Sequence, residues 1–358
     1  MISDSVHGFD QIFSQTQPLR TLKGFLQKDA IPHALLFTGI AGIGKRMTAT
    51  AFAMAANCLE TKPDITSYGK NPPPGDKGTF ADSAVSPNPC ERCSSCKKIR
   101  SGNHPDIIFI EPDGAMIKIH QIRDLLGTLA LKPYEARVRF VIIAESHTMN
   151  PSAANALLKV LEEPPDRTIF ILTATEASTL LPTILSRCRR VRFNPVSRPD
   201  IVRLLQITRG IDPEQGKTLA AMAEGSFGRV LSMSRSNWGR RRKWLIIAGG
   251  LENPHLLSGR SRSSLLAFSE ELAKSKSTVG DSIAVMKTWF RDLVVWKYAP
   301  GKIINQDLAD QVRCASANST VEALLKKIEV LEQAQRDVAT NMNLRLSLDL
   351  LMLRLGEP

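Results

Sequence analysis

Short apolar runs alternate with helical patterns along the first half of the chain. Most of the runs are rich in Ile, Leu, Val and Phe, as in strands that are buried on both faces of a parallel sheet. They lie at residues 34–38, 107–110, 138–143, 168–172 and 190–193. Helical spacing is found at residues 47–59, 119–131 and 153–161. This alternation predicts an α/β domain with a doubly wound parallel sheet over residues 1–195.

Beyond Pro195 the apolar runs end and amphipathic helical spacing continues to the end of the chain. Short helices, separated by glycines, are predicted at residues 198–208, 213–223 and 226–233. They predict a small three-helix lid domain over residues 196–236. Longer amphipathic segments follow at residues 265–274, 282–297, 320–338 and 342–355. The fold class is therefore α/β followed by all-α, with a C-terminal helical domain over residues 237–358.

Composition places the chain among packed proteins. It has 358 residues, of which 43% are hydrophobic and 23% charged, enough for about two or three domains. The first twenty residues are polar and no segment has the uncharged length of a membrane span, so we expect a cytoplasmic protein with no membrane partner. The net charge of +12 fits a nucleic-acid partner or simply a well-solvated surface. The basic cluster at residues 240–243 has the same two interpretations, a phosphate contact or a solvated helix face.

A glycine-rich segment follows the first predicted strand. Gly39, Gly42 and Gly44 allow backbone N–H groups to face phosphate oxygens, and Lys45 adds a positive charge for the β and γ phosphates. Because a helix is predicted directly afterwards, the segment has the strand, loop and helix order of a phosphate loop. These four residues are the candidates for binding ATP or ADP.

Both positions that would hold magnesium in such a pocket carry unsuitable side chains. Arg46 stands where Ser or Thr is needed, and its guanidinium would repel the ion. Ala144 stands at the end of a strand where an aspartate is needed, although Glu145 follows it and could orient a water molecule. Phosphoryl transfer depends on such electrostatic stabilisation, so the pattern predicts a nucleotide fold without its chemistry. Whether the pocket is empty or binds nucleotide without hydrolysing it stays open.

Four of the six cysteines have the spacing of a metal site. Cys90, Cys93 and Cys96 recur at every third position, and Cys58 ends the helix predicted after the phosphate loop. Four thiolates suit tetrahedral zinc, and the Pro-, Gly- and Ser-rich loop at residues 62–89 could return the chain to the first cysteine. The alternatives are four reduced thiols or two disulfides.

The predicted zinc site is structural, because four cysteines leave no open coordination position and no His-Glu pair lies nearby. His104 could replace one ligand, but we expect it just outside the site.

Two further segments carry a family resemblance. Residues 150–165 read NPSAANALLKVLEEPP and residues 185–188 read LSRC. Both resemble the clamp-loader subunits of the bacterial replicative DNA polymerase III holoenzyme, which have the AAA+ fold. The zinc module of that family also inserts after the phosphate-loop helix, with one cysteine and a Cys-x-x-Cys-x-x-Cys triplet. The similarity covers the whole chain in layout, its sharp motifs lie between Gly39 and Cys188, and the C-terminal half matches only as helices.

Within this family, the residues at the magnesium positions, Arg46 and Ala144, resemble the delta-prime type rather than the catalytic gamma/tau type. The pattern Gly-Ser-x-Arg, which holds a phosphate-sensing arginine in the ATP-binding members, has Gly228 in place of the arginine. Arg229 comes one position late and is expected to face elsewhere, since one helical step turns a side chain by about 100°.

Polar sensors of the γ-phosphate in the family correspond to Thr173 and Thr175. These could equally be ordinary hydroxyls at the end of a strand.

The resemblance assigns Arg187 the role of a trans arginine finger that reaches ATP on a neighbouring subunit. From the flanking sequence alone, a structural ion pair at the sheet edge is the alternative.

The resemblance implies a non-hydrolysing stator in a hetero-oligomer with gamma/tau and delta subunits. It would join them through the C-terminal helices as a collar and help to load the sliding clamp on primer–template DNA. The alternatives are an ATP-hydrolysing gamma/tau-like subunit, which Lys45 and Glu145 permit, and a zinc-bearing DNA-binding module with a vestigial ATPase fold.

Overall fold

A computed structural model of the chain describes residues 8–28, 30–61, 88–235, 242, 244–246, 262–274, 276–339 and 343–357. Most of the loop expected at residues 62–89 lies outside these residues, as does the basic cluster at residues 240–243 apart from Arg242. The chain divides into two compact units, Met1–Asp200 with Gly225–Gly228 and Ile201–Glu224 with Arg229–Pro358. The division expected at residues 195 and 236 stays a prediction.

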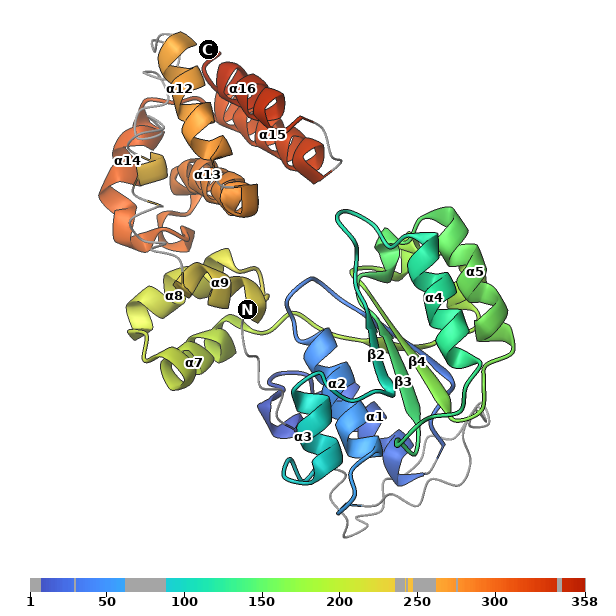
Figure 1. The fold of residues 1–358 in the computed structure, drawn as a ribbon. Coiled ribbons are helices and arrows are strands. Elements are labelled where there is room, and N and C mark those ends of the chain that lie inside the picture. The colour runs from blue at the N-terminus through green and yellow to red at the C-terminus, as the bar shows by residue number, and fades with distance from the viewer. Residues whose placement is uncertain are drawn as a thin grey trace. The chain divides into compact units, whose positions relative to one another are not determined.

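The first unit is built on a parallel sheet (Figure 1). Its described strands are β1 (Ala34–Thr38), β2 (Ile107–Ile110), β3 (Arg139–Ile143), β4 (Thr168–Ala174) and β5 (Arg189–Arg192), in the order β2-β3-β4-β1-β5. Because all neighbouring strands are parallel, their carboxyl ends meet at one edge of the sheet. The predicted doubly wound sheet is confirmed.

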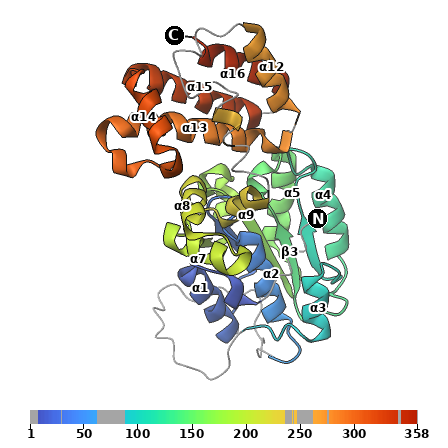
Figure 2. The ribbon, with the colours of Figure 1, turned by 90° about the vertical axis from the view of Figure 1, so that its left-hand side faces the viewer.

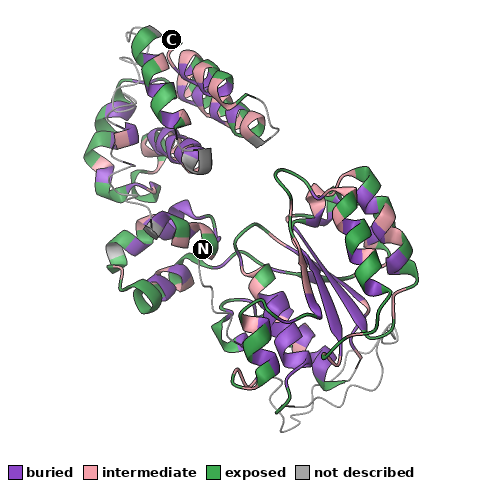
Figure 3. Cartoon of the chain, viewed as in Figure 1, coloured by how far each residue is buried: buried purple, intermediate pink, exposed green. Residues whose placement is uncertain are grey.

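Helices cover both faces of this sheet. One core joins α1 (Thr16–Gln27), α2 (Lys45–Ala56) and α3 (Ser94–Arg100) to the face that carries Leu35 and Phe37. The other joins α4 (Ile119–Leu129), α5 (Pro151–Glu162) and α6 (Pro182–Leu185) to the face that carries Leu36. Since successive strand residues face opposite sides, the inner strands β1, β3 and β4, which are covered on both faces, are buried throughout. Figure 3 shows buried residues along the sheet.

The second unit is helical (Figures 1 and 2). Its helices are α7 (Arg198–Arg209), whose first three residues belong to the first unit, α8 (Pro213–Met222), α9 (Phe227–Arg235, from Arg229), α12 (Arg262–Ala273), α13 (Lys276–Tyr298), α14 (Ala309–Ala317), α15 (Val321–Ala339) and α16 (Leu344–Leu355). Helix α13 packs against α14 and α15, and α12 packs against α16. Trp289 and Phe290 of α13 are fully buried, so the predicted helical C-terminal region is confirmed. Among the helices described, none combines the length and the apolar character that crossing a bilayer requires.

A buried polar network lies within the second unit. The fully buried Asp292 carboxylate accepts hydrogen bonds from the backbone N–H groups of Ile304 and Asn305 and from the Asn305 side chain, at 2.7 to 3.0 Å. Arg242, which is also buried, donates to Asn305 and pairs with Asp307. For Arg242, both interpretations of the basic cluster are therefore wrong, because its charge is used inside the fold.

Another buried carboxylate, that of Asp106, holds the loop before β3. It accepts the backbone N–H groups of Tyr134, Glu135 and Ala136, each at 2.8 Å, and lies 3.6 Å from the Arg139 guanidinium. Burial raises its pKa, but the three hydrogen bonds and the arginine outweigh this effect and hold the pKa below its ordinary value.

Asp106→Asn is therefore expected to lower the free energy of unfolding by about 2–3 kcal/mol at pH 7, because an amide cannot accept the same set of N–H groups. The folded-state pKa is lowered, so this stabilisation is fully present above the unfolded-state pKa and is lost as the pH falls through the folded-state value. Urea unfolding of both proteins at pH 7 and under acid conditions checks this, with the exposed Asp124→Asn as control. A difference that does not shrink in acid would contradict it.

Candidate functional site

The phosphate loop joins β1 to α2 at the carboxyl edge of the sheet. Gly39, Gly42 and Gly44 have φ angles of 145°, 75° and 96°, in the region that favours glycine. At Gly39 a Cβ atom would lie 2.5 Å from the Ile43 side chain and 2.7 Å from the Phe193 carbonyl oxygen. The loop therefore needs glycine both for its turns and for its close packing, and it places the N-terminus of α2 behind the phosphate position.

The Lys45 side chain folds back on this loop. Its Nζ donates to the carbonyl oxygens of Gly39 and Ile40, the second at 2.8 Å. Burial lowers the pKa of Lys45 to about 8, although the Glu145 carboxylate acts in the opposite direction. The lysine ammonium thus lies against the phosphate loop itself.

The Arg46 side chain is held at the position of a magnesium ligand. Its guanidinium pairs with the carboxylate of Glu111, which directly follows β2, and lies over the Phe109 ring with Cζ 5.1 Å from the ring centroid. A guanidinium has no lone pair for a metal ion. At the second position, the Ala144 N–H continues the strand pairing to Ile110 at 2.8 Å and its side chain offers no ligand atom.

The threonines at the end of β4 have structural contacts. The Thr173 hydroxyl is buried and accepts the backbone N–H of Glu145 at 3.1 Å. The carbonyl of Thr175 accepts the N–H of Gly39 at 3.0 Å. The contact of the Thr173 hydroxyl favours the interpretation of this residue as an ordinary hydroxyl at the end of a strand.

Residues 225–228 belong to the first unit and contact the phosphate loop. The Gly228 N–H donates to the Gly42 carbonyl oxygen at 2.8 Å, and a Cβ at Gly228 would lie 3.0 Å from the Gly42 Cα. The residue at the place of the family's sensor arginine therefore makes a backbone contact that a side chain would crowd. Arg229 lies 3.7 Å from Glu224 in an ion pair.

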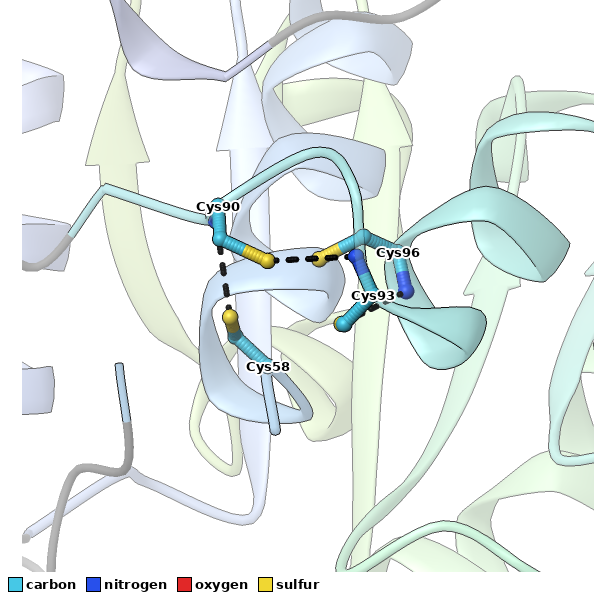
Figure 4. A group of neighbouring side chains, drawn as sticks. All are labelled: Cys58, Cys90, Cys93 and Cys96. Carbon is cyan, nitrogen blue, oxygen red and sulfur yellow. Dashed lines mark hydrogen bonds between the residues drawn. The ribbon is translucent and has the colours of Figure 1, made fainter. Parts of the chain in front are cut away.

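The four predicted cysteines converge beyond the end of α2 (Figure 4). Their sulfur atoms all lie within 4.8 Å of one another. Bonds of 2.3 Å to a tetrahedral zinc ion would place the sulfurs about 3.8 Å apart, so only a small contraction is needed. All four are free thiols, which does not agree with the two-disulfide alternative.

Backbone N–H groups point at three of these sulfurs. Cys90 donates to the Cys58 sulfur at 3.4 Å, Cys93 to the Cys90 sulfur at 3.3 Å, and Cys96 to the Cys93 sulfur at 3.4 Å. Burial disfavours the thiolate of Cys58, but hydrogen bonds from Thr61, from Cys90 and from the Glu60 backbone outweigh burial and lower its pKa to about 6. Burial raises the pKa values of Cys90 and Cys96. A divalent cation would supply the missing positive charge, and the donor set fits one.

This cysteine cluster lies at the opposite end of α2 from the phosphate loop. A helix of 12 residues is about 18 Å long. The Asn57 side chain exchanges two hydrogen bonds with the backbone of Val138, and Arg137 donates to the Cys58 carbonyl at 2.9 Å. The cluster is thus fixed near the amino ends of the strands, where a bound ion could not contact a nucleotide.

His104 lies outside the cysteine cluster, as expected. It is buried, its Nδ1 accepts the backbone N–H of Asp106 at 3.2 Å, and its Nε2 lies 3.7 Å from Glu135.

Arg187 lies at the amino edge of the sheet. It comes two residues before β5, whose Arg189 is opposite Leu35 near the start of β1, whereas the phosphate loop follows Thr38 at the other end. The length of β1, about 16 Å, therefore separates Arg187 from its own phosphate loop. Arg187 and the chain's own phosphate loop therefore lie at opposite ends of the sheet.

The Arg187 guanidinium is held by three contacts. NH2 pairs with Glu162 at 2.6 Å, and NH1 donates to the Thr183 carbonyl at 2.9 Å and to the Ser186 hydroxyl at 3.3 Å. The ion pair expected at the sheet edge is present. The arginine side chain is still 33% exposed, so it is accessible to a partner.

Two family models match the chain. One, described as DNA polymerase III, delta subunit, matches residues 77–197, and the C-terminal model of the same description matches residues 256–357. DNA polymerase III subunit delta' of Bacillus subtilis is 27% identical over 344 residues, which cover 96% of each chain. The chain belongs to the DNA polymerase III clamp-loader family.

The chain is also similar to DNA polymerase III subunit tau of Bacillus subtilis, with 28% identity over 352 residues. That alignment covers 92% of this chain but only 58% of the tau chain. Among solved structures, a gamma subunit-related protein from Thermotoga maritima has a TM-score of 0.46 and 19% identity, and the match covers 95% of this chain and 98% of that one.

Three contact residues at these sites were not predicted from the sequence. Glu111 and Phe109 hold Arg46, and Glu162 holds Arg187. Glu111 could have been found, because a charged residue directly after a strand at the carboxyl edge lies beside the pocket. Glu162 lies within the motif at residues 150–165, but nothing in that motif indicates a pairing with Arg187.

Proposed function

We propose that this clamp-loader family member is a delta-prime-type stator that does not hydrolyse ATP itself. It supplies Arg187 to ATP on a neighbouring gamma/tau-type subunit. In a cytoplasmic hetero-oligomer with gamma/tau and delta subunits, it helps to load the sliding clamp on primer–template DNA. The observation that carries this proposal is the pairing of Arg46 with Glu111 at the place of a magnesium ligand.

The missing metal ligands bear directly on phosphoryl transfer. The charge that develops on the transferring phosphoryl group must be neutralised, and magnesium supplies most of that stabilisation in phosphate-loop enzymes. Arg46 and Ala144 leave both ligand positions without an oxygen donor. Gly39, Gly42 and Gly44 keep the loop shape, so nucleotide binding without turnover is compatible with this proposal.

The cysteine cluster would hold a structural zinc ion on Cys58, Cys90, Cys93 and Cys96. Bound zinc would neutralise the thiolates and tie the end of α2 to the start of α3. Because the cluster lies about 18 Å from the phosphate loop along α2, this role concerns stability and not turnover.

The C-terminal helices within residues 237–358, from α12 to α16, are the proposed collar that binds the other subunits. Leu346 and Leu350 of α16 are 65% and 45% exposed and lie one helical turn apart, on the same side of the helix. An exposed apolar stripe of this kind supports a role in subunit contact.

The isolated chain is expected to have no magnesium-dependent ATPase activity above background. A purified ATP-hydrolysing gamma/tau-type subunit serves as the positive control, and titration with labelled ATP and ADP reports whether the pocket binds nucleotide. Brisk hydrolysis by the isolated chain, abolished by Lys45→Ala, would overturn the stator proposal.

That outcome would support the second candidate, an ATP-hydrolysing gamma/tau-like subunit. Two observations favour it: Lys45 and Glu145 are present, and the identity to tau, 28%, is similar to that to delta', 27%. The third candidate, a zinc-bearing DNA-binding module, draws on the net charge of +12. It requires tight DNA binding by the chain alone, with a steep dependence on salt.

A further inference from the structure

Glu162 is the last residue of α5 and makes the 2.6 Å ion pair with Arg187. The helix that carries it is firmly placed in the first unit. Asn150 caps its start by accepting the Ala153 N–H at 2.8 Å, and Leu157 and Leu161 are buried against the sheet. The Glu162 carboxylate is therefore presented from a rigid element.

The position of Glu162 is unfavourable for the helix itself. The C-terminus of a helix carries partial negative charge, so an acidic residue in the last turn is destabilising unless a cation compensates for it. Lys159 also stands in this last turn, and Arg187 is the cation that pairs directly with Glu162. Because both side chains are partly exposed, the ion pair adds little to folding stability. A role of Glu162 in holding the Arg187 side chain is therefore the better explanation for this ion pair.

We infer that Glu162 is a positioning residue for Arg187 in catalysis across the subunit boundary. This inference rests on the proposed function of Arg187. The contacts to Glu162, Thr183 and Ser186 use three of the five guanidinium N–H groups and fix the side chain before a neighbour binds. The remaining donors can then meet phosphate oxygens with little further loss of side-chain freedom.

Glu162→Gln tests this inference in a loader reconstituted with ATP-hydrolysing partner subunits. The amide keeps the shape but loses the charge, so we expect kcat to fall about three- to tenfold with an unchanged KM for ATP. Subunit assembly and the melting temperature should not change. Glu163→Gln is the matched control, because Glu163 is the adjacent exposed acid, and it should leave kcat unchanged. Glu162→Asp should retain part of the rate.

Arg187→Ala and the double variant separate this inference from the proposed function. If Glu162 acts through Arg187, adding Glu162→Gln to Arg187→Ala changes nothing further. A rate that Arg187→Ala leaves unchanged overturns the proposed function. A rate that falls with Arg187→Ala but not with Glu162→Gln overturns only the inference on Glu162. Faster hydrolysis by Glu162→Gln, or a further loss in the double variant, overturns it as well.

Discussion

Arg187→Ala is expected to leave subunit assembly intact and to slow ATP hydrolysis at the facing site by about 10³-fold, the lower range known for arginine fingers. A planar guanidinium held beside the transferring phosphoryl group stabilises charge that an alanine cannot. Arg187 lies at the amino edge of its own sheet, away from its own phosphate loop, so the effect must appear at a neighbour's site.

Single-turnover hydrolysis in the reconstituted loader measures this effect at one site, because the steady-state rate also contains turnover elsewhere. Arg190→Ala is the matched control, since Arg190 is an exposed arginine three residues further along the chain, within β5. Arg187→Lys should restore only part of the rate, because an ammonium keeps the charge but not the planar donor set. Unchanged single-turnover rates in Arg187→Ala would show that the ion pair with Glu162 is only structural.

The inner part of the sheet could be predicted from the sequence because β1, β3 and β4 are buried on both faces. The apolar runs at residues 34–38 and 107–110 coincide with β1 and β2. The run at residues 168–172 is extended in the structure by Thr173 and Ala174, which complete β4. A polar residue ended the predicted strand there, whereas in the fold its hydroxyl is satisfied by the Glu145 N–H.

Helices with weak apolar patterns could not be predicted in the same way. Helix α1 contains Pro18 in its first turn and carries many polar residues. Helix α3 begins at the cysteine motif, where the Cys93 sulfur accepts the Cys96 N–H and caps the helix. A Cys-x-x-Cys run is normally interpreted as a turn around a metal, so the helix that continues from it was missed.

At the candidate sites, motifs that are contiguous in the sequence could be recognised, whereas contacts between distant residues could not. The phosphate loop is contiguous and the cysteine triplet has a fixed spacing, so both were visible in the sequence. The ion pairs of Arg46 with Glu111 and of Arg187 with Glu162 join residues 65 and 25 positions apart. Only the folded structure brings these charges together, because Arg46 at the start of α2 reaches the end of β2 and α5 packs beside α6.

Cys96→Ser is expected to abolish binding of the proposed zinc ion and to lower the free energy of unfolding by on the order of 3 kcal/mol. Cys96 is fully buried, and its backbone N–H donates to the Cys93 sulfur. Without the ion, the sulfur of the buried Cys58 and those of the half-buried Cys90 and Cys93 remain close together with no cation to neutralise them, and the link between α2 and α3 is weakened.

Metal content by mass spectrometry and urea unfolding check this together, with the exposed Cys314→Ser as the matched control. A strong chelator should destabilise the unsubstituted protein by a similar amount and leave Cys96→Ser unaffected, because the variant has no ion to lose. Since the cluster and the phosphate loop lie at opposite ends of α2, nucleotide titration of the variant under conditions where it is folded should match that of the unsubstituted protein. One zinc ion retained per chain with full stability in Cys96→Ser would mean that this thiolate is not a ligand.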